Sequence, residues 1–90
     1  MSGDSIGGVV EDAYGQPVPG MRIIIVNGTA PFPELAPETN ENGGYKFPGL
    51  NPGTFEIAVH DRRGNRLAQK KSKVRRGEAS RLDFVLPAQP

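Results

Sequence analysis

The sequence contains a single histidine, His60, directly beside an acidic residue, Asp61. A hydrolase of the nucleophilic type needs a nucleophile, a base, and a group that orients the base. Neighbouring residues of a strand point to opposite faces, so His60 and Asp61 do not form an orienting pair. We therefore predict a protein that is not an enzyme, without catalytic residues, and place His60 at the surface.

Oxygen-bearing side chains gather in two predicted turns, at Asp12 and at residues 40–42. Calcium takes about six to eight oxygen ligands, and this spacing matches no calcium-binding loop. The chain has no cysteine, which excludes disulfides and thiolate metal sites. Turn formation explains these side chains, and we predict no metal and no cofactor.

The most basic part of the chain extends from Arg62 to Arg76. Residues 1–45 hold one basic and six acidic residues, whereas residues 46–90 hold ten basic and four acidic ones, so the molecule carries an electrostatic dipole. We expect one positive edge, which either discourages aggregation or attracts an anionic partner or surface. Specific nucleic-acid recognition is not expected, because no aromatic residue lies between Arg62 and Arg81. The basic candidate contact residues are Arg62, Arg63, Arg66, Lys70, Lys71, Arg75 and Arg76.

Length and composition indicate one all-β domain. Ninety residues suit a single modest core, and 12 glycines with 9 prolines favour short strands joined by tight turns. No apolar run is long enough for a transmembrane segment, and the first residues do not form a signal peptide. We predict a domain over residues 5–86, an N-terminal tail over 1–4, and a C-terminal tail or linker over 87–90.

Alternating and β-branched residues locate the strands. Ile6 and Val10 share one side of a first strand, and the apolar run 21–26 predicts a strand near the centre of a sheet. Residues 39–59 predict a strand-pairing unit, a turn and a strand followed by a second turn and strand, with Phe55, Ile57 and Val59 inward. Two further strands are predicted over 66–74 and 80–86.

The segment 27–37 contains three prolines, so we predict an extended surface loop there. Phe32 either covers the second face of the strand at 21–26 as a lid or is an exposed contact residue. Tyr14, in the turn after the first strand, is the other aromatic residue expected outside the core. Together they are the aromatic candidate contact residues.

The order of turn and core residues resembles the carboxypeptidase regulatory-like domain over nearly the whole chain. The matching positions are Ile6-x-Gly8-x-Val10, Asp12, Gly15-x-Pro17-Val18-x-Gly20, Thr39, Gly43, Tyr45-x-Phe47, Leu50, Gly53-x-Phe55, Val59 and Leu82-x-Phe84. The resemblance implies an antiparallel Greek-key β-sandwich of about seven strands, prealbumin-like and Ig-like, related to the B-type repeats of collagen adhesins and to starch-binding domains. Such motifs identify a fold and not an activity.

The resemblance also implies a non-catalytic accessory module that contacts other domains or subunits of a larger or multi-subunit assembly. The alternative is a module that binds carbohydrate or another ligand through the 27–37 loop. Partners in the first case are proteins or an anionic surface. The compartment is not determined by the sequence, although an extracytoplasmic location follows if these residues come from a larger surface or secreted protein.

Overall fold

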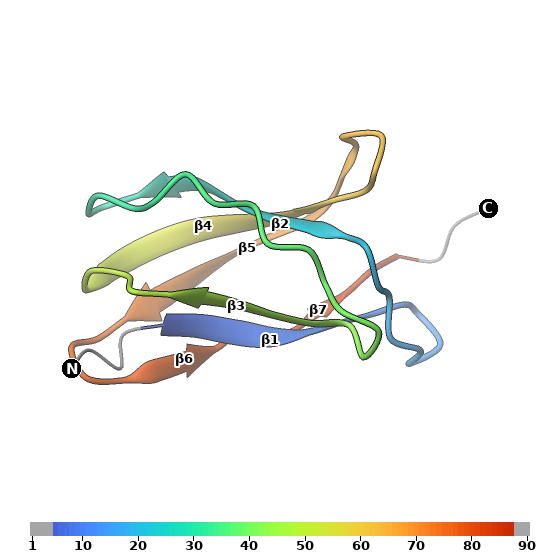
Figure 1. Ribbon diagram of the computed structural model, residues 1–90, viewed down its shortest axis with the longest axis horizontal. Coiled ribbons are helices and arrows are strands. Elements are labelled where there is room, and N and C mark those ends of the chain that lie inside the picture. The colour runs from blue at the N-terminus through green and yellow to red at the C-terminus, as the bar shows by residue number, and fades with distance from the viewer. Residues whose placement is uncertain (1–4, 88–90) are drawn as a thin grey trace.

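Seven strands form two layers in the computed structural model, which describes residues 5–87 (Figure 1). The predicted tail 1–4 and all of 87–90 except Pro87 lie outside the described residues. The all-β sandwich with seven strands is confirmed. The strands are β1 (Ser5–Glu11), β2 (Arg22–Gly28), β3 (Gly44–Pro48), β4 (Gly53–His60), β5 (Arg66–Val74), β6 (Ala79–Arg81) and β7 (Phe84–Val85).

One layer has the order β3-β1-β6, with β7 also paired to β1, and the other has the order β2-β4-β5. Pairing is antiparallel throughout the second layer and between β1 and β3. At the other side of β1, β6 and β7 run parallel to it, so the first and last strands of the described chain lie side by side.

The core lies between the layers and is built from alternate residues of each strand. Phe55, Ile57 and Val59 are fully buried on β4, as their spacing predicts. Ile6 and Val10 of β1 meet them from the other layer. Burying a side chain of this size contributes roughly 1.5–3 kcal/mol, so these alternating residues supply much of the stability.

The apolar run 21–26 does not lie at the centre of a sheet. It forms β2, an edge strand, and the central strand of that layer is β4. The free side of β2 is covered near its start, where Ile23 donates to the Pro37 carbonyl at 2.9 Å. Val26, farther along β2, is 44% exposed. An apolar edge strand is tolerated here because the following loop lies along part of it.

The segment 39–59 is not a strand-pairing unit. β3 pairs with β1, β4 pairs with β2 and β5, and the two strands belong to different layers. Leu50, between them, is only 3% exposed. It anchors a crossing between the layers, and Pro48 and Pro52 on either side disfavour a tight hairpin.

The predicted last strand over 80–86 is interrupted at Leu82 and Asp83, between β6 and β7. Leu82 donates to the Gly7 carbonyl at 2.9 Å, while a side-chain oxygen of Asp83 accepts from the Val9 amide at 2.9 Å. The buried Tyr45 hydroxyl donates to the Leu82 carbonyl. Burial, with a smaller contribution from the Asp83 charge, raises the pKa of Tyr45 and keeps this donor protonated.

Candidate interaction site

Three turns of the same design lie at one end of the sandwich, at the right in Figure 1. Each begins with Asp or Asn and has glycine at its fourth position: residues 12–16, 40–44 and 61–65. In each, the first side chain accepts from the amides two and four residues later. The first side chain thereby replaces main-chain hydrogen bonds within the turn.

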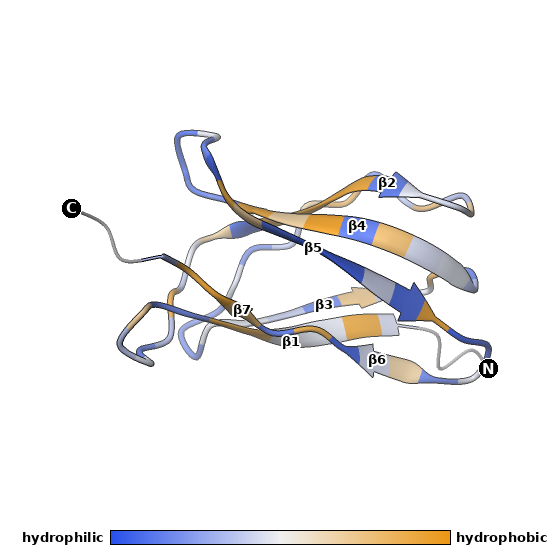
Figure 2. Cartoon of the chain, turned by 180° about the vertical axis from the view of Figure 1, so that it is seen from behind, coloured by the Kyte–Doolittle hydropathy of each residue, from blue (hydrophilic) through white to orange (hydrophobic). Residues whose placement is uncertain are grey.

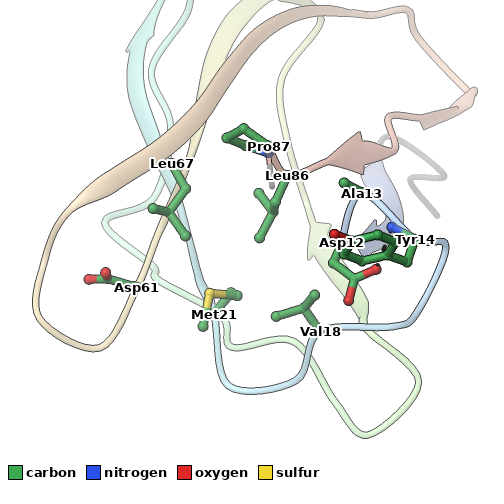
Figure 3. Close-up of a pocket in the computed structure, with 9 residues that line it drawn as sticks. All are labelled: Asp12, Ala13, Tyr14, Val18, Met21, Asp61, Leu67, Leu86 and Pro87. Carbon is green, nitrogen blue, oxygen red and sulfur yellow. Dashed lines mark hydrogen bonds between the residues drawn. The ribbon is translucent and has the colours of Figure 1, made fainter. Parts of the chain in front are cut away.

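A cleft of about 480 Å³ opens at this end between the two layers (Figure 3). We call it the open-end cleft. Partly buried Val18, Met21 and Leu67 surround it together with buried Leu86. Tyr14 lies beside it and is 81% exposed. The remaining lining residues are Asp12, Ala13, Asp61 and Pro87.

Leu67 reaches the cleft because of a β-bulge. In the β4–β5 ladder Val59 pairs with Ala68 and His60 with Arg66, so Leu67 is the extra residue. The shift in alternation allows Leu67 and buried Val74 to face inward from one strand although their numbers differ in parity. Both residues therefore pack toward the core.

The two acids at the cleft are already engaged in their own turns. Hydrogen bonds from Asn65, with a smaller contribution from Arg63, hold the pKa of Asp61 below its usual value despite some desolvation. Asp12 accepts from Tyr14 and Gln16 at 2.8 and 3.0 Å. The cleft therefore offers an apolar surface with an aromatic ring rather than a free acid or base.

Phe32 lies away from this end and does not form a surface with Tyr14. It is partly buried against the core, with its ring edge-on to Phe55 at a centroid distance of 6.1 Å and an angle of 87°. Its cover over the outer face of β2 is partial: Ile24 is partly buried and lines a pocket together with Phe32, whereas Val26, at the irregularity in the β2–β4 pairing, is 44% exposed. The loop closes one side of the core, and Tyr14 and Phe32 do not form a two-ring platform for a sugar within residues 5–87.

The predicted loop is shorter at its start, because Asn27 and Gly28 belong to β2. It is held to the rest of the fold at its end, where the Ile23 amide donates to the Pro37 carbonyl, and at two positions in its first part. Asn51 donates to the Pro31 carbonyl at 2.9 Å, and the Thr54 amide donates to the Thr29 hydroxyl at 2.9 Å. These contacts fit a packed strap rather than a free binding loop.

The basic candidate residues extend along the full length of β5 and into the turns at its two ends. Arg62, Arg63 and Arg66 lie at or next to the β4–β5 turn, whereas Arg75 and Arg76 follow the other end of β5. A strand of 9 residues separates these groups by about 30 Å. The Arg62 guanidinium packs against Gly20, where an added Cβ would lie 2.6 Å from a guanidinium nitrogen.

The two candidate lysines of β5 point to opposite faces. Lys70 turns toward the other layer, where its ammonium donates to the Asp83 carbonyl at 2.7 Å and lies 5.5 Å from the centre of the Phe84 ring. Lys71 lies on the outer face, 3.7 Å from Glu56. Lys70 therefore helps to join the layers, and Lys71 remains at the surface.

Within residues 5–87 no three His, Cys, Asp or Glu side chains gather as a metal site would require. The described part of the chain also has no helix suited to crossing a membrane.

The open-end cleft itself was not predicted from the sequence. The repeated Asx-x-x-Gly spacing at residues 12, 40 and 61 was the available signal, because three identical turns at strand ends suggest loops that share one end.

Comparisons with known proteins agree with this architecture. The sequence matches the family described as "Carboxypeptidase regulatory-like domain" over residues 5–87. A search of curated proteins found no match. A DUF3823 family protein from Bacteroides uniformis ATCC 8492 is similar in structure, with a TM-score of 0.63, 13% identity, and coverage of 92% of this chain and 42% of that one.

A second similar structure is a C-terminal interface mutant of the type II cohesin–X–dockerin complex from Acetivibrio cellulolyticus. Its TM-score is 0.56 and its identity 11%, with coverage of 92% of this chain and 52% of that one. At such identities the likeness concerns the fold alone. The chain spans about half the length of these two structures.

Proposed function

This chain belongs to the carboxypeptidase regulatory-like domain family, and we propose that it is a non-catalytic interaction module that contacts another protein domain or subunit. On this proposal residues 5–86 act as a single accessory domain of a larger or multi-subunit assembly. The similar structure from Acetivibrio cellulolyticus comes from a protein complex, which is compatible with such a use of the fold but does not identify a partner.

The open-end cleft is the observation that carries the proposal. Tyr14 is 81% exposed beside aliphatic side chains that the two layers leave partly uncovered. Tyrosine is enriched at protein interfaces because its rigid ring covers much area and its hydroxyl still finds a polar partner. The acids at the cleft are engaged in their turns, which favours contact over catalysis.

Photo-crosslinking in the organism that makes the protein tests this proposal. We would place p-benzoylphenylalanine in place of Tyr14 and, as a control outside the cleft, in place of Val26, which is 44% exposed on β2. We expect a discrete adduct from position 14 that is absent or weak from position 26. Mass spectrometry of the adduct would identify the partner and the peptide in contact.

A second substitution separates a specific contact from chance proximity. Leu67→Ser should weaken the adduct at position 14, since it removes an aliphatic side chain from the cleft. Failure to form an adduct at position 14, or equal adducts at both positions, would contradict the proposed interface.

A further inference from the structure

The edge of β5 that faces away from β4 carries main-chain N–H and C=O groups, and the described residues form few hydrogen bonds to them. The Ser80 hydroxyl donates to the Lys73 carbonyl at 2.8 Å, so that carbonyl faces away from β4. Antiparallel ladders alternate, so the N–H and C=O groups of Gln69 and Lys71 face the same way. The structure gives these groups no hydrogen bond within residues 5–87.

All charged side chains of β5 are positive. Arg66, Lys70, Lys71 and Lys73 belong to the strand; Lys71 and Lys73 lie on its outer face, where Glu56 of β4 is 3.7 Å from Lys71, while Lys70 turns toward the other layer. Figure 2 shows the hydrophilic character of β5 along most of its length. An incoming strand would therefore meet the positive side chains of Lys71 and Lys73 at alternate positions on the outer face.

We propose that the free edge of β5 binds an acidic, extended segment of another polypeptide as an added strand. Main-chain groups of Gln69 and Lys71 would supply the ladder, and the lysines would select the sequence. Opposite charges directly across a ladder stabilise the pairing, whereas like charges directly opposite destabilise it.

A second copy of this chain fits the edge less well. In a two-fold pairing of β5 with itself, the same surface meets itself and places lysines of one copy against lysines of the other. Lysines on an exposed edge are a common defence against such pairing. The same residues that repel another copy attract glutamate or aspartate, so the acidic strand is the favoured occupant.

This proposal concerns a different surface from the open-end cleft and does not depend on it. The test uses the complete chain and two capped synthetic peptides of the same length, one alternating Glu and Val and one alternating Lys and Val. Isotope-labelled protein would be titrated with each and followed by amide chemical shifts. We expect the Glu peptide to shift resonances of residues 68–74 and the Lys peptide to have no effect.

Two protein variants separate ladder formation from simple charge attraction. Lys71→Ala and Lys71→Pro lose the same charge, but only proline also removes the outward N–H. That N–H faces away from β4, and proline is tolerated at such edge positions. We expect Lys71→Pro to bind the Glu peptide roughly tenfold or more weakly than Lys71→Ala, as the loss of a ladder bond and its neighbours implies.

A third reagent keeps the test decisive if Lys71→Pro does not fold. A Glu peptide methylated on alternate main-chain nitrogens keeps its charge but cannot pair as a strand, so it should lose binding to the unaltered protein. No binding of the Glu peptide, equal binding of the Glu and Lys peptides, or equal binding of the methylated and unmethylated peptides would each overturn the proposal.

Discussion

At Gly8 the first strand of the described chain packs tightly against residues 82–83 near its end. A Cβ added there would lie 1.9 Å from the Leu82 carbonyl oxygen and 2.6 Å from the carbonyl carbon. Both are main-chain atoms, so no side-chain rotation relieves the overlap. The absence of a side chain at Gly8 thus allows the break between β6 and β7 to lie against β1.

Gly8→Ala should therefore destabilise the protein strongly. Overpacking of this kind costs roughly 1–3 kcal/mol and occasionally more, and we expect a value at or above the upper end. Urea unfolding would measure the change. Gly7→Ala on the same strand is the control, because its nearest contact would be 3.2 Å and a small shift relieves it. Equal losses in the two variants would contradict this role of Gly8.

Asp83 couples the stability of the same region to pH. Partial desolvation opposes its ionisation, but hydrogen bonds from Arg81 and the Val9 amide outweigh that effect and hold its pKa below the usual value. The unfolded chain therefore takes up its proton first as the pH falls. The contribution of Asp83 is present above its unfolded pKa and is lost as the pH falls through its lower folded pKa.

Asp83→Ala should lower the free energy of unfolding at pH 7 by roughly 1 kcal/mol, since the Val9 amide loses its acceptor. The difference between variant and parent should begin to shrink as the pH falls below about 4, near the pKa of the unfolded chain, and should disappear once the pH is below the lowered pKa of Asp83 in the folded protein. Urea unfolding at several pH values measures both effects. A difference that stays constant down to pH 2 would rule out the carboxylate charge as the cause.

The alternation of apolar and polar residues along a strand predicts which residues face the core. Contacts between segments distant in sequence determine the other side-chain orientations. Phe55, Ile57 and Val59 are buried as predicted, because one residue in two must face inward whichever strand lies alongside. The inward turn of Lys70 was not predictable, since it depends on the Asp83 carbonyl, which is distant in sequence.

At the scale of elements, the three equivalent turns differ in how tightly their glycines are packed. Gly15, Gly43 and Gly64 all have positive φ, at 81°, 75° and 86°. A Cβ on Gly43 would lie 2.5 Å from the Val10 carbonyl oxygen, whereas Gly15 and Gly64 have open space around them. The turn at residues 40–44 is therefore packed against β1, and the other two are free.

Alanine at each of these glycines should separate backbone strain from packing. All three variants lose roughly 1–2 kcal/mol through the left-handed conformation, and Gly43→Ala should lose at least as much again through the clash with the Val10 carbonyl. Thermal unfolding of the three variants gives the comparison. Equal melting temperatures would show that the turn at residues 40–44 relaxes away from β1.

The position of each strand within its sheet was harder to predict than the location of the strand in the sequence. The run 21–26 has apolar residues on both faces, which is typical of a central strand, yet β2 is an edge because the loop after it supplies the cover. Likewise β3 and β4 are neighbours in sequence without pairing, and buried Leu50 between them is what separates them into two layers. Pairing partners depend on long-range contacts that periodicity does not report.

At the scale of the whole molecule, the basic half of the sequence is concentrated around one exposed edge. β5 and the turns at its two ends hold most of the positive charge of the chain. β2, the strand at the opposite edge of the same sheet, is followed by a loop that contains Glu34 and Glu38. The predicted dipole therefore becomes a difference between two sides of one sheet. Such a charge difference steers partners and limits pairing between copies.

The lysines of β5 should thus be necessary to keep the chain monomeric. Lys71→Val with Lys73→Val replaces two outward charges by β-branched side chains beside free main-chain groups, which favours strand pairing between copies. Sedimentation velocity over a range of concentrations should show association of this double variant and not of the parent. Arg75→Val with Arg76→Val is the control, since it removes the same charge from the turn and leaves the strand unchanged. If both double variants associate equally, net charge and not the β5 edge governs association.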